Sequence, residues 1–268
     1  MWDPAQYQRH SDARSRAFFE LTARIAATSP RYVVDFGCGP GNLTAALAER
    51  WPDADVLGVD SSAEMLEAAQ AALADHKRRA NGSGGSLSFR LADLRDFELP
   101  REPDVIVSNA VLHWIPDHHD LLRRWVSALA AGGWLAFQIP ANFDQPINEI
   151  TRDLARSPRW RDALADIPVP RLARSAADYL DPLAGAGCEV DAWETTYQHI
   201  MQGEDPVLDW YKGTALRPAI AALPAEDAAE YLEECAIRLR EKYPARSYGT
   251  VLPFRRVFVV ARKRERSR

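Results

Sequence analysis

Short apolar runs alternate with helical patterns over residues 31–139 of the chain. The β-rich runs are bounded by turn residues, and the helical segments repeat apolar residues at intervals of three and four. These patterns predict strands at 31–36, 55–60, 87–91, 104–108 and 134–139, and helices at 42–50, about 61–80 and 121–129. Strands separated by helices of this length predict a parallel sheet built from right-handed βαβ units.

The second half of the chain has a different pattern. It predicts a helix at 176–187, a long strand at 189–201, helical structure over 205–243 broken at Pro218 and Pro224, and a last strand at 256–262. The expected fold is therefore one α/β domain over 1–268, a doubly wound, seven-stranded, mostly parallel Rossmann-like sheet whose last strand is antiparallel. Helical insertions at about 1–28, 141–175 and 205–250 are expected to form a cap.

Composition narrows the classes of function. The 268 residues carry 33 Lys and Arg against 38 Asp and Glu, a net charge of −5. This balance argues against a nucleic-acid partner, because binding to phosphates needs a basic footprint. The three cysteines show no metal-ligand or disulfide spacing, and we expect no metal. With no signal-peptide pattern and no apolar run of spanning length, the expected location is the cytoplasm, without a membrane partner.

A glycine-rich turn follows the first predicted strand directly. Glycine at 37, 39 and 41 allows a sharp turn and a close approach of the backbone to a ligand. A dinucleotide site would need another glycine where Asn42 stands. Asp35, two residues before the turn, would repel a pyrophosphate but suits a ligand with an ammonium group, such as S-adenosylmethionine. Asp60 ends the second strand, where a carboxylate can accept ribose hydroxyls under either interpretation.

These segments resemble the motifs of the class I S-adenosylmethionine-dependent methyltransferases. The glycine motif spans 33–42, the acidic motif 59–62, the adenine-facing segment 92–94 and the segment that borders the methyl group 109–114. The resemblance implies S-adenosylmethionine as cofactor and S-adenosylhomocysteine as product. The cofactor-binding residues that it implies, with Met65 also expected to pack in the core, are Asp35, Gly37, Gly39, Gly41, Asp60, Ser61, Met65, Asp93, Leu94 and Asn109.

Over nearly the whole chain, the sequence is similar to the trans-aconitate methyltransferases. The segments that carry this similarity are 1–4 with Tyr7, 60–62, 112–118, 209–210 with 213–218, and 256–262. The resemblance implies O-methylation of one carboxylate of trans-aconitate, a small polycarboxylate, to a monomethyl ester. The chain departs from the expected pattern at Phe254-Arg255, which leaves open whether Arg255 or Arg256 points inward.

The chemistry of this reaction defines what the site must supply. A carboxylate has a reference pKa near ~4 and is ionised at neutral pH, so it needs no general base. We therefore expect no catalytic acid or base, only positioning and desolvation. The remaining carboxylates need cationic and hydrogen-bonding partners. The candidates for substrate binding are His113, Trp114, Tyr211, Lys212, Arg217 and Arg256.

Each candidate also has a purely structural interpretation. Arg217, before Pro218, is equally compatible with a surface turn, and Arg256 with a surface ion pair. Three other functions stay open at this stage. They are a methyltransferase with another small-metabolite acceptor, a nicotinamide-dependent dehydrogenase, against which Asp35 and Asn42 count, and a binding module that retains S-adenosylmethionine without turnover. The sequence leaves the oligomeric state open.

Overall fold

The computed structural model describes residues 11–79, 84–115, 118–142, 144–165, 167, 174–213 and 215–265. Within these ranges the strands are β1 (Tyr32–Phe36), β2 (Asp55–Asp60), β3 (Leu87–Leu91), β4 (Val105–Asn109), β5 (Trp134–Pro140), β6 (Cys188–Met201) and β7 (Thr250–Lys263). The first ten residues of the expected 1–28 insertion, with the 1–4 segment, lie outside the described residues.

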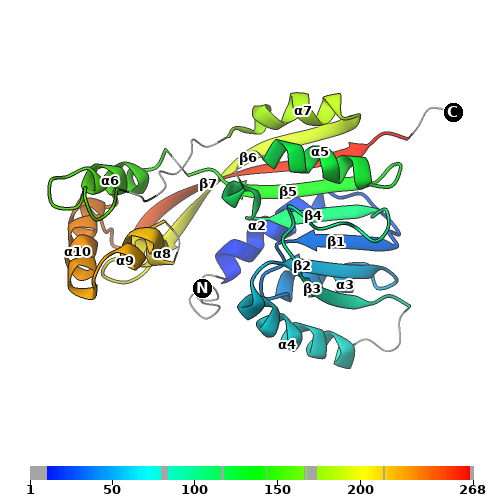
Figure 1. Ribbon diagram of the computed structural model, residues 1–268, viewed down its shortest axis with the longest axis horizontal. Coiled ribbons are helices and arrows are strands. Elements are labelled where there is room, and N and C mark those ends of the chain that lie inside the picture. Colours follow the sequence, from blue (N-terminus) through cyan, green and yellow to red (C-terminus); the bar gives the residue numbers. More distant parts are fainter. Residues whose placement is uncertain are drawn as a thin grey trace. The chain divides into compact units, whose positions relative to one another are not determined.

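The strands form one seven-stranded sheet in the order β3-β2-β1-β4-β5-β7-β6 (Figure 1). The pairs among β1 to β5 are all parallel. β7 runs antiparallel to β5, because Lys263 N at the end of β7 donates to Gly133 O before β5, and Ala141 N after β5 donates to Arg255 O near the start of β7. The predicted doubly wound, mostly parallel sheet with an antiparallel last strand is confirmed. The order reverses between β1 and β4, the switch point where such folds bind ligands.

The helices of the described residues are α2 (Ser11–Ala23), α3 (Asn42–Arg50), α4 (Ala63–Arg79), α5 (His118–Ala128), α6 (Pro146–Ala155), α7 (Leu180–Gly185), α8 (Pro206–Lys212), α9 (Arg217–Ala222) and α10 (Ala225–Lys242), with the 3-10 helices η1 (Leu112–Trp114) and η2 (Ala176–Tyr179). The helices predicted at 42–50, about 61–80 and 121–129 are confirmed as α3, α4 and α5. α3 packs on β2, and α4 packs on β2 and β3. All five residues of β1 are buried, so the strand that leads to the glycine turn lies in the core of the sheet.

The structure corrects the predicted second half of the chain in three places. The helical structure predicted over 205–243 is three helices, and the break predicted at Pro224 is confirmed, because Pro224 caps α10. The break predicted at Pro218 lies earlier, since α8 ends at Lys212 and Pro218 lies in the first turn of α9, where the missing N–H costs no hydrogen bond. The last strand begins at Thr250 rather than at 256. The segment 176–187 is the 3-10 helix η2 followed by the short α7. The helices α2 and α6 were not predicted.

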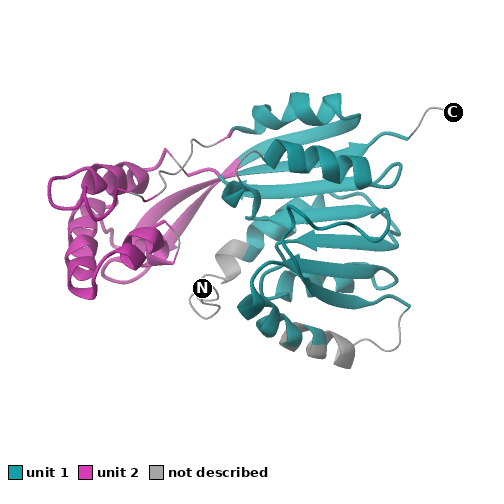
Figure 2. Cartoon of the chain, viewed as in Figure 1, with its two compact units in different colours: residues 1–140, 175–194, 257–268 teal, residues 141–174, 195–256 magenta. Residues whose placement is uncertain are grey.

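The chain divides into two compact units (Figure 2). Unit 1 comprises residues 1–140, 175–194 and 257–268, and unit 2 comprises residues 141–174 and 195–256. The expected insertions at 141–175 and 205–250 fall almost entirely in unit 2, where α6 and α8 pack on α10. Their expected role as a substrate cap stays a prediction. In the described part of the chain, no helix is both long and apolar enough to span a membrane.

Candidate active site

The glycine turn after β1 has the backbone that its sequence predicts. Gly37, Gly39 and Gly41 have φ values of +75°, +54° and +77°, all in the left-handed region that favours glycine. The turn is fixed to the neighbouring strand, since Gly37 N donates to Val59 O at 2.8 Å. A Cβ atom on Gly37 would overlap Val111, whereas no atom of the described residues lies within 4 Å of one built on Gly39. The backbone at Gly39 therefore faces open space, into which a ligand could fit.

These environments predict different effects for two alanine substitutions. Gly37→Ala adds a clash with Val111 to the backbone strain, and we expect it to lower the free energy of unfolding by about 3–5 kcal/mol. The matched control Gly39→Ala carries only the strain, about 1–2 kcal/mol, but places a methyl group in the open space. Urea unfolding measures both. Equal stability losses would contradict the packing described for Gly37.

Asp35 is a buried acid beside the turn. Only 3% of its surface is exposed, and on β1 it pairs with Gly58 of β2 and Val107 of β4 at the centre of the sheet. Thr44 Oγ1 of α3 donates a 2.6 Å hydrogen bond to Asp35 Oδ2. Burial raises the pKa of Asp35 from its ordinary value of 3.8 to about 7, opposed by the Thr44 bond and reinforced by the charge of Asp60. The carboxyl would gain from a cationic partner.

Asp60 connects the glycine turn to the start of α4. Its Oδ2 accepts from Gly39 N and its Oδ1 from Ser62 N, both at 2.9 Å. Ser62 in turn caps α4, since Met65 N donates to Ser62 Oγ at 3.2 Å. Met65 is buried and Ser61 is exposed. Asp60 is thereby held next to the open face at Gly39.

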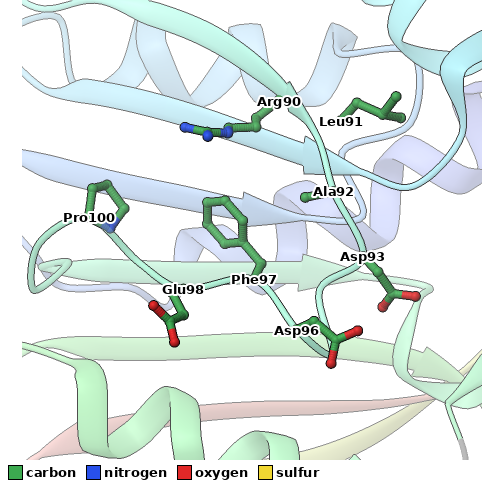
Figure 3. Close-up of a pocket in the computed structure, with 8 residues that line it drawn as sticks. All are labelled: Arg90, Leu91, Ala92, Asp93, Asp96, Phe97, Glu98 and Pro100. Carbon is green, nitrogen blue, oxygen red and sulfur yellow. The ribbon is translucent and has the colours of Figure 1, made fainter.

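Asp93 follows β3 at the rim of a pocket of about 460 Å³ (Figure 3). Figure 3 shows Asp93 and Asp96 at one end of this pocket and Pro100 at the other, with Phe97 between them. Arg95 donates to both carboxylate oxygens of Asp93 and holds the pKa of this carboxyl below its ordinary value. Each ionised oxygen can still accept another bond, as contact with an adenine amine would require. The neighbouring Leu94 is buried.

The segment after β4 carries local strain. Ala110 has φ +59°, the only positive φ at a non-glycine residue in the described ranges, and strain of this kind clusters at functional sites. Before it, Asn109 Oδ1 is buried without a hydrogen-bond partner among the described residues. After it, Val111 packs against Gly37. The segment therefore lies against the glycine turn and presents an unused acceptor atom.

The predicted substrate-binding residues divide between the two units. His113 and Trp114 lie in η1 of unit 1, with ring centroids 4.8 Å apart, and Trp114 is exposed. The other four lie in unit 2 and are Tyr211, Lys212, Arg217 and Arg256. Lys212 Nζ forms an ion pair with Asp209 Oδ1 of the same helix, α8, at 2.9 Å. Arg217 is half-buried at the start of α9.

Arg256 and Arg255 have different environments, which answers the question left by the sequence. Arg256 is only 3% exposed, and its guanidinium carbon lies 4.7 Å from the centre of the Phe254 ring. Arg255 is half-buried, and its side chain donates to Ala141 O at 3.1 Å and pairs with Asp144. Because neighbours on a strand point to opposite faces, Arg256 is the arginine on the buried side of β7.

An aromatic cluster beside Arg256 was not predicted from the sequence. Its members are Tyr197, His199, Trp210 and Phe254, which contact one another with ring centroids 5.2 to 6.0 Å apart. Tyr197 and His199 are two residues apart on β6, so the strand alternation could have placed them on one face. Two of these rings, Phe254 and Tyr197, have their centres 4.7 and 5.9 Å from the guanidinium carbon of Arg256. A cation at such a distance from an aromatic face is attracted to it.

Tyr211, next to this cluster in sequence, is a second buried donor in unit 2. It is 5% exposed, and its hydroxyl has no hydrogen-bond partner among the described residues. Burial raises the pKa of this phenol, so it stays protonated at neutral pH and can donate. An unsatisfied buried hydroxyl is costly and is found where a ligand completes the site.

A family model and solved structures show which class of protein this chain belongs to. The family model described as "Methyltransferase domain" matches residues 7–193. Solved structures share the fold, including the YcgJ protein of Bacillus subtilis (TM-score 0.57, 15% identity, 92% of this chain and 97% of that chain) and a putative methyltransferase from Bacillus halodurans (TM-score 0.55, 16% identity, 91% and 97%). The chain therefore contains a methyltransferase domain, and these structures share its fold.

Curated relatives narrow this class. A trans-aconitate 2-methyltransferase of Streptomyces avermitilis is 49% identical over 98% of this chain and 97% of its own length. The enzyme of that name from Rhodococcus jostii is 50% identical over 97% and 99%, and that from Mycobacterium tuberculosis is 45% identical over 97% and 96%. The chain belongs to the methyltransferase-domain family and, within it, to the trans-aconitate 2-methyltransferase family.

Proposed function

We propose that this protein transfers a methyl group from S-adenosylmethionine to a carboxylate of trans-aconitate and forms the monomethyl ester. The observation that carries the proposal is the 45–50% identity, over nearly the full length of both chains, to relatives named for this reaction. The buried Arg256 and the unsatisfied Tyr211 hydroxyl in unit 2 support an acceptor with several carboxylates.

The residues of unit 1 fit S-adenosylmethionine. A buried acid, an open glycine backbone and an unused amide oxygen suit its ammonium group and its other donors. When bound, S-adenosylmethionine supplies an electrophilic methyl group on a positively charged sulfur. The residues that we propose to hold it are Asp35, Gly37, Gly39, Gly41, Asp60, Ser61, Met65, Asp93, Leu94 and Asn109.

The protein's own contribution to the reaction is positioning. The acceptor carboxylate is already ionised at neutral pH, so no side chain has to remove a proton. Arg256 can donate two parallel hydrogen bonds to a carboxylate, and Tyr211 can donate one more from a hydroxyl that burial keeps protonated. We propose these two, with His113, Trp114, Lys212 and Arg217, as the substrate-binding residues. The rate enhancement would then come from holding the attacking carboxylate oxygen in line with the methyl group and away from water.

The proposal is tested by following S-adenosylhomocysteine release with trans-aconitate as acceptor. We expect turnover that depends on trans-aconitate, and none with its trimethyl ester, which lacks every free carboxylate. Equal turnover with the two acceptors would contradict carboxylate methylation. Tight cofactor binding without turnover on any acceptor would favour a binding module.

We also propose the cytoplasm as the place of action. Cys38, Cys188 and Cys235 are all free and buried, which fits a reducing compartment.

A further inference from the structure

Thr44 is a buried hydroxyl that is directed at the acid of the cofactor site. It lies in the first turn of α3 and is 0% exposed. Its Oγ1 donates to Asp35 Oδ2 at 2.6 Å, a short bond between two buried side chains. Threonine is a weak helix former, and its apolar isostere valine would pack equally well at this position. The hydroxyl therefore has a role that packing alone does not explain.

The surroundings of Asp35 show what this hydroxyl counteracts. Burial opposes the charge on Asp35, and so does the carboxylate of Asp60 at the end of β2. The other titratable neighbour is the Cys38 thiol, whose pKa burial raises so far that it stays neutral. Among these groups, the Thr44 hydroxyl is the one that favours the ionised form of Asp35. Without Thr44, the acid would take up a proton more readily and would lose its fixed orientation.

We propose that Thr44 is a positioning residue, which holds the Asp35 carboxylate ionised and oriented to receive the ammonium group of S-adenosylmethionine. The inference rests on the proposed role of Asp35 in binding the cofactor. Thr44 acts through Asp35 and donates its one proton to the carboxylate. A ligand that binds only the ionised acid should bind more tightly as the pH rises toward and through 7, and removal of the Thr44 bond should move this dependence to higher pH.

The test compares Thr44→Val with Thr44→Ser, which keeps the hydroxyl. Calorimetric titration with S-adenosylhomocysteine between pH 6 and 8 is the measurement. We expect Thr44→Val to weaken binding about ten- to a hundredfold at pH 7 and to shift the pH midpoint upward by about one unit, and Thr44→Ser to restore both to within a few-fold. The second probe is 5′-methylthioadenosine, which has the nucleoside but no amino-acid arm. Its affinity should be the same in all three proteins.

The outcomes separate this inference from the proposed function. An unchanged pH midpoint in Thr44→Val would overturn the role of Thr44, and so would equal losses for the two probes, which indicate a structural effect. A wild-type protein that binds neither probe would overturn the proposed function itself. A midpoint that shifts with S-adenosylhomocysteine alone supports the inference.

Discussion

Replacing Arg256 with methionine should lower kcat/KM for trans-aconitate by about 30- to 3,000-fold, the range for losing one partner of a buried charge pair. Arg256 is almost fully buried among aromatic rings in unit 2. Methionine keeps an unbranched apolar stem of comparable length, so the cluster stays filled. The loss should appear mainly in KM, because the guanidinium binds carboxylates in the ground state and the transition state alike.

The adjacent arginine provides the matched control. Arg255→Met removes a side chain that is already engaged by Ala141 O and Asp144, and we expect kcat/KM to stay within about threefold of wild type. The affinity for S-adenosylhomocysteine should be unchanged in both variants. A folded Arg256→Met protein with wild-type kcat/KM would contradict the assignment, and a larger loss in Arg255→Met would reverse it.

Asp35→Asn should weaken binding of S-adenosylhomocysteine by about 30- to 1,000-fold, because the ammonium group loses a buried carboxylate partner. The same substitution should stabilise the ligand-free protein. Folding raises the pKa of Asp35 to about 7, so the folded state binds the extra proton between about pH 4 and 7. Stability due to this group therefore falls as the pH rises through that window. Above about pH 7, the neutral amide of the variant avoids the free-energy cost of a buried negative charge, about 2–4 kcal/mol.

Urea unfolding at pH 5 and pH 8 checks this prediction. Asp35→Asn should exceed wild type in stability at pH 8, and the difference should shrink toward pH 5. Asp55→Asn is the control, since Asp55 starts the neighbouring strand and its pKa is lowered by bonds from Ser86 and Arg101. The lowered pKa of Asp55 contributes to the stability of the protein above pH 4. Asp55→Asn should therefore destabilise the protein slightly and leave its cofactor affinity unchanged. Loss of stability in Asp35→Asn at pH 8 would contradict a destabilising buried charge on Asp35.

The parallel half of the fold was predictable because its signals are local. Val33, Val34 and Phe36 are fully buried in β1, and a continuous apolar run ending in glycines needs no distant partner to be recognised. The predicted bounds of α3, Asn42–Arg50, are the bounds observed. In the second half, α6 was missed although Ile147, Ile150 and Leu154 form a buried stripe, and Pro146 in its first turn marks a helix start.

The cofactor motifs were recognisable, but the contacts that tune them were not. The pattern around Asp35 and Gly39 lies within a few residues, whereas the Thr44 bond to Asp35 depends on how α3 packs against β1. The choice between Arg255 and Arg256 also depended on tertiary structure. Successive side chains on a strand point to opposite faces, but the sequence does not show which of the two faces is buried. The aromatic cluster joins residues from β6, α8 and β7, a proximity that no local pattern encodes.

The acceptor is identified by transfer of labelled methyl from S-adenosylmethionine, with trans-aconitate, citrate, isocitrate and a phenolic acid as competing acceptors. We expect a labelled product from trans-aconitate in preference to the others, and mild base should release its label, as it does from a methyl ester. Base-stable labelling of the phenolic acid, or no transfer to any carboxylate despite cofactor binding, would contradict the assignment of the acceptor.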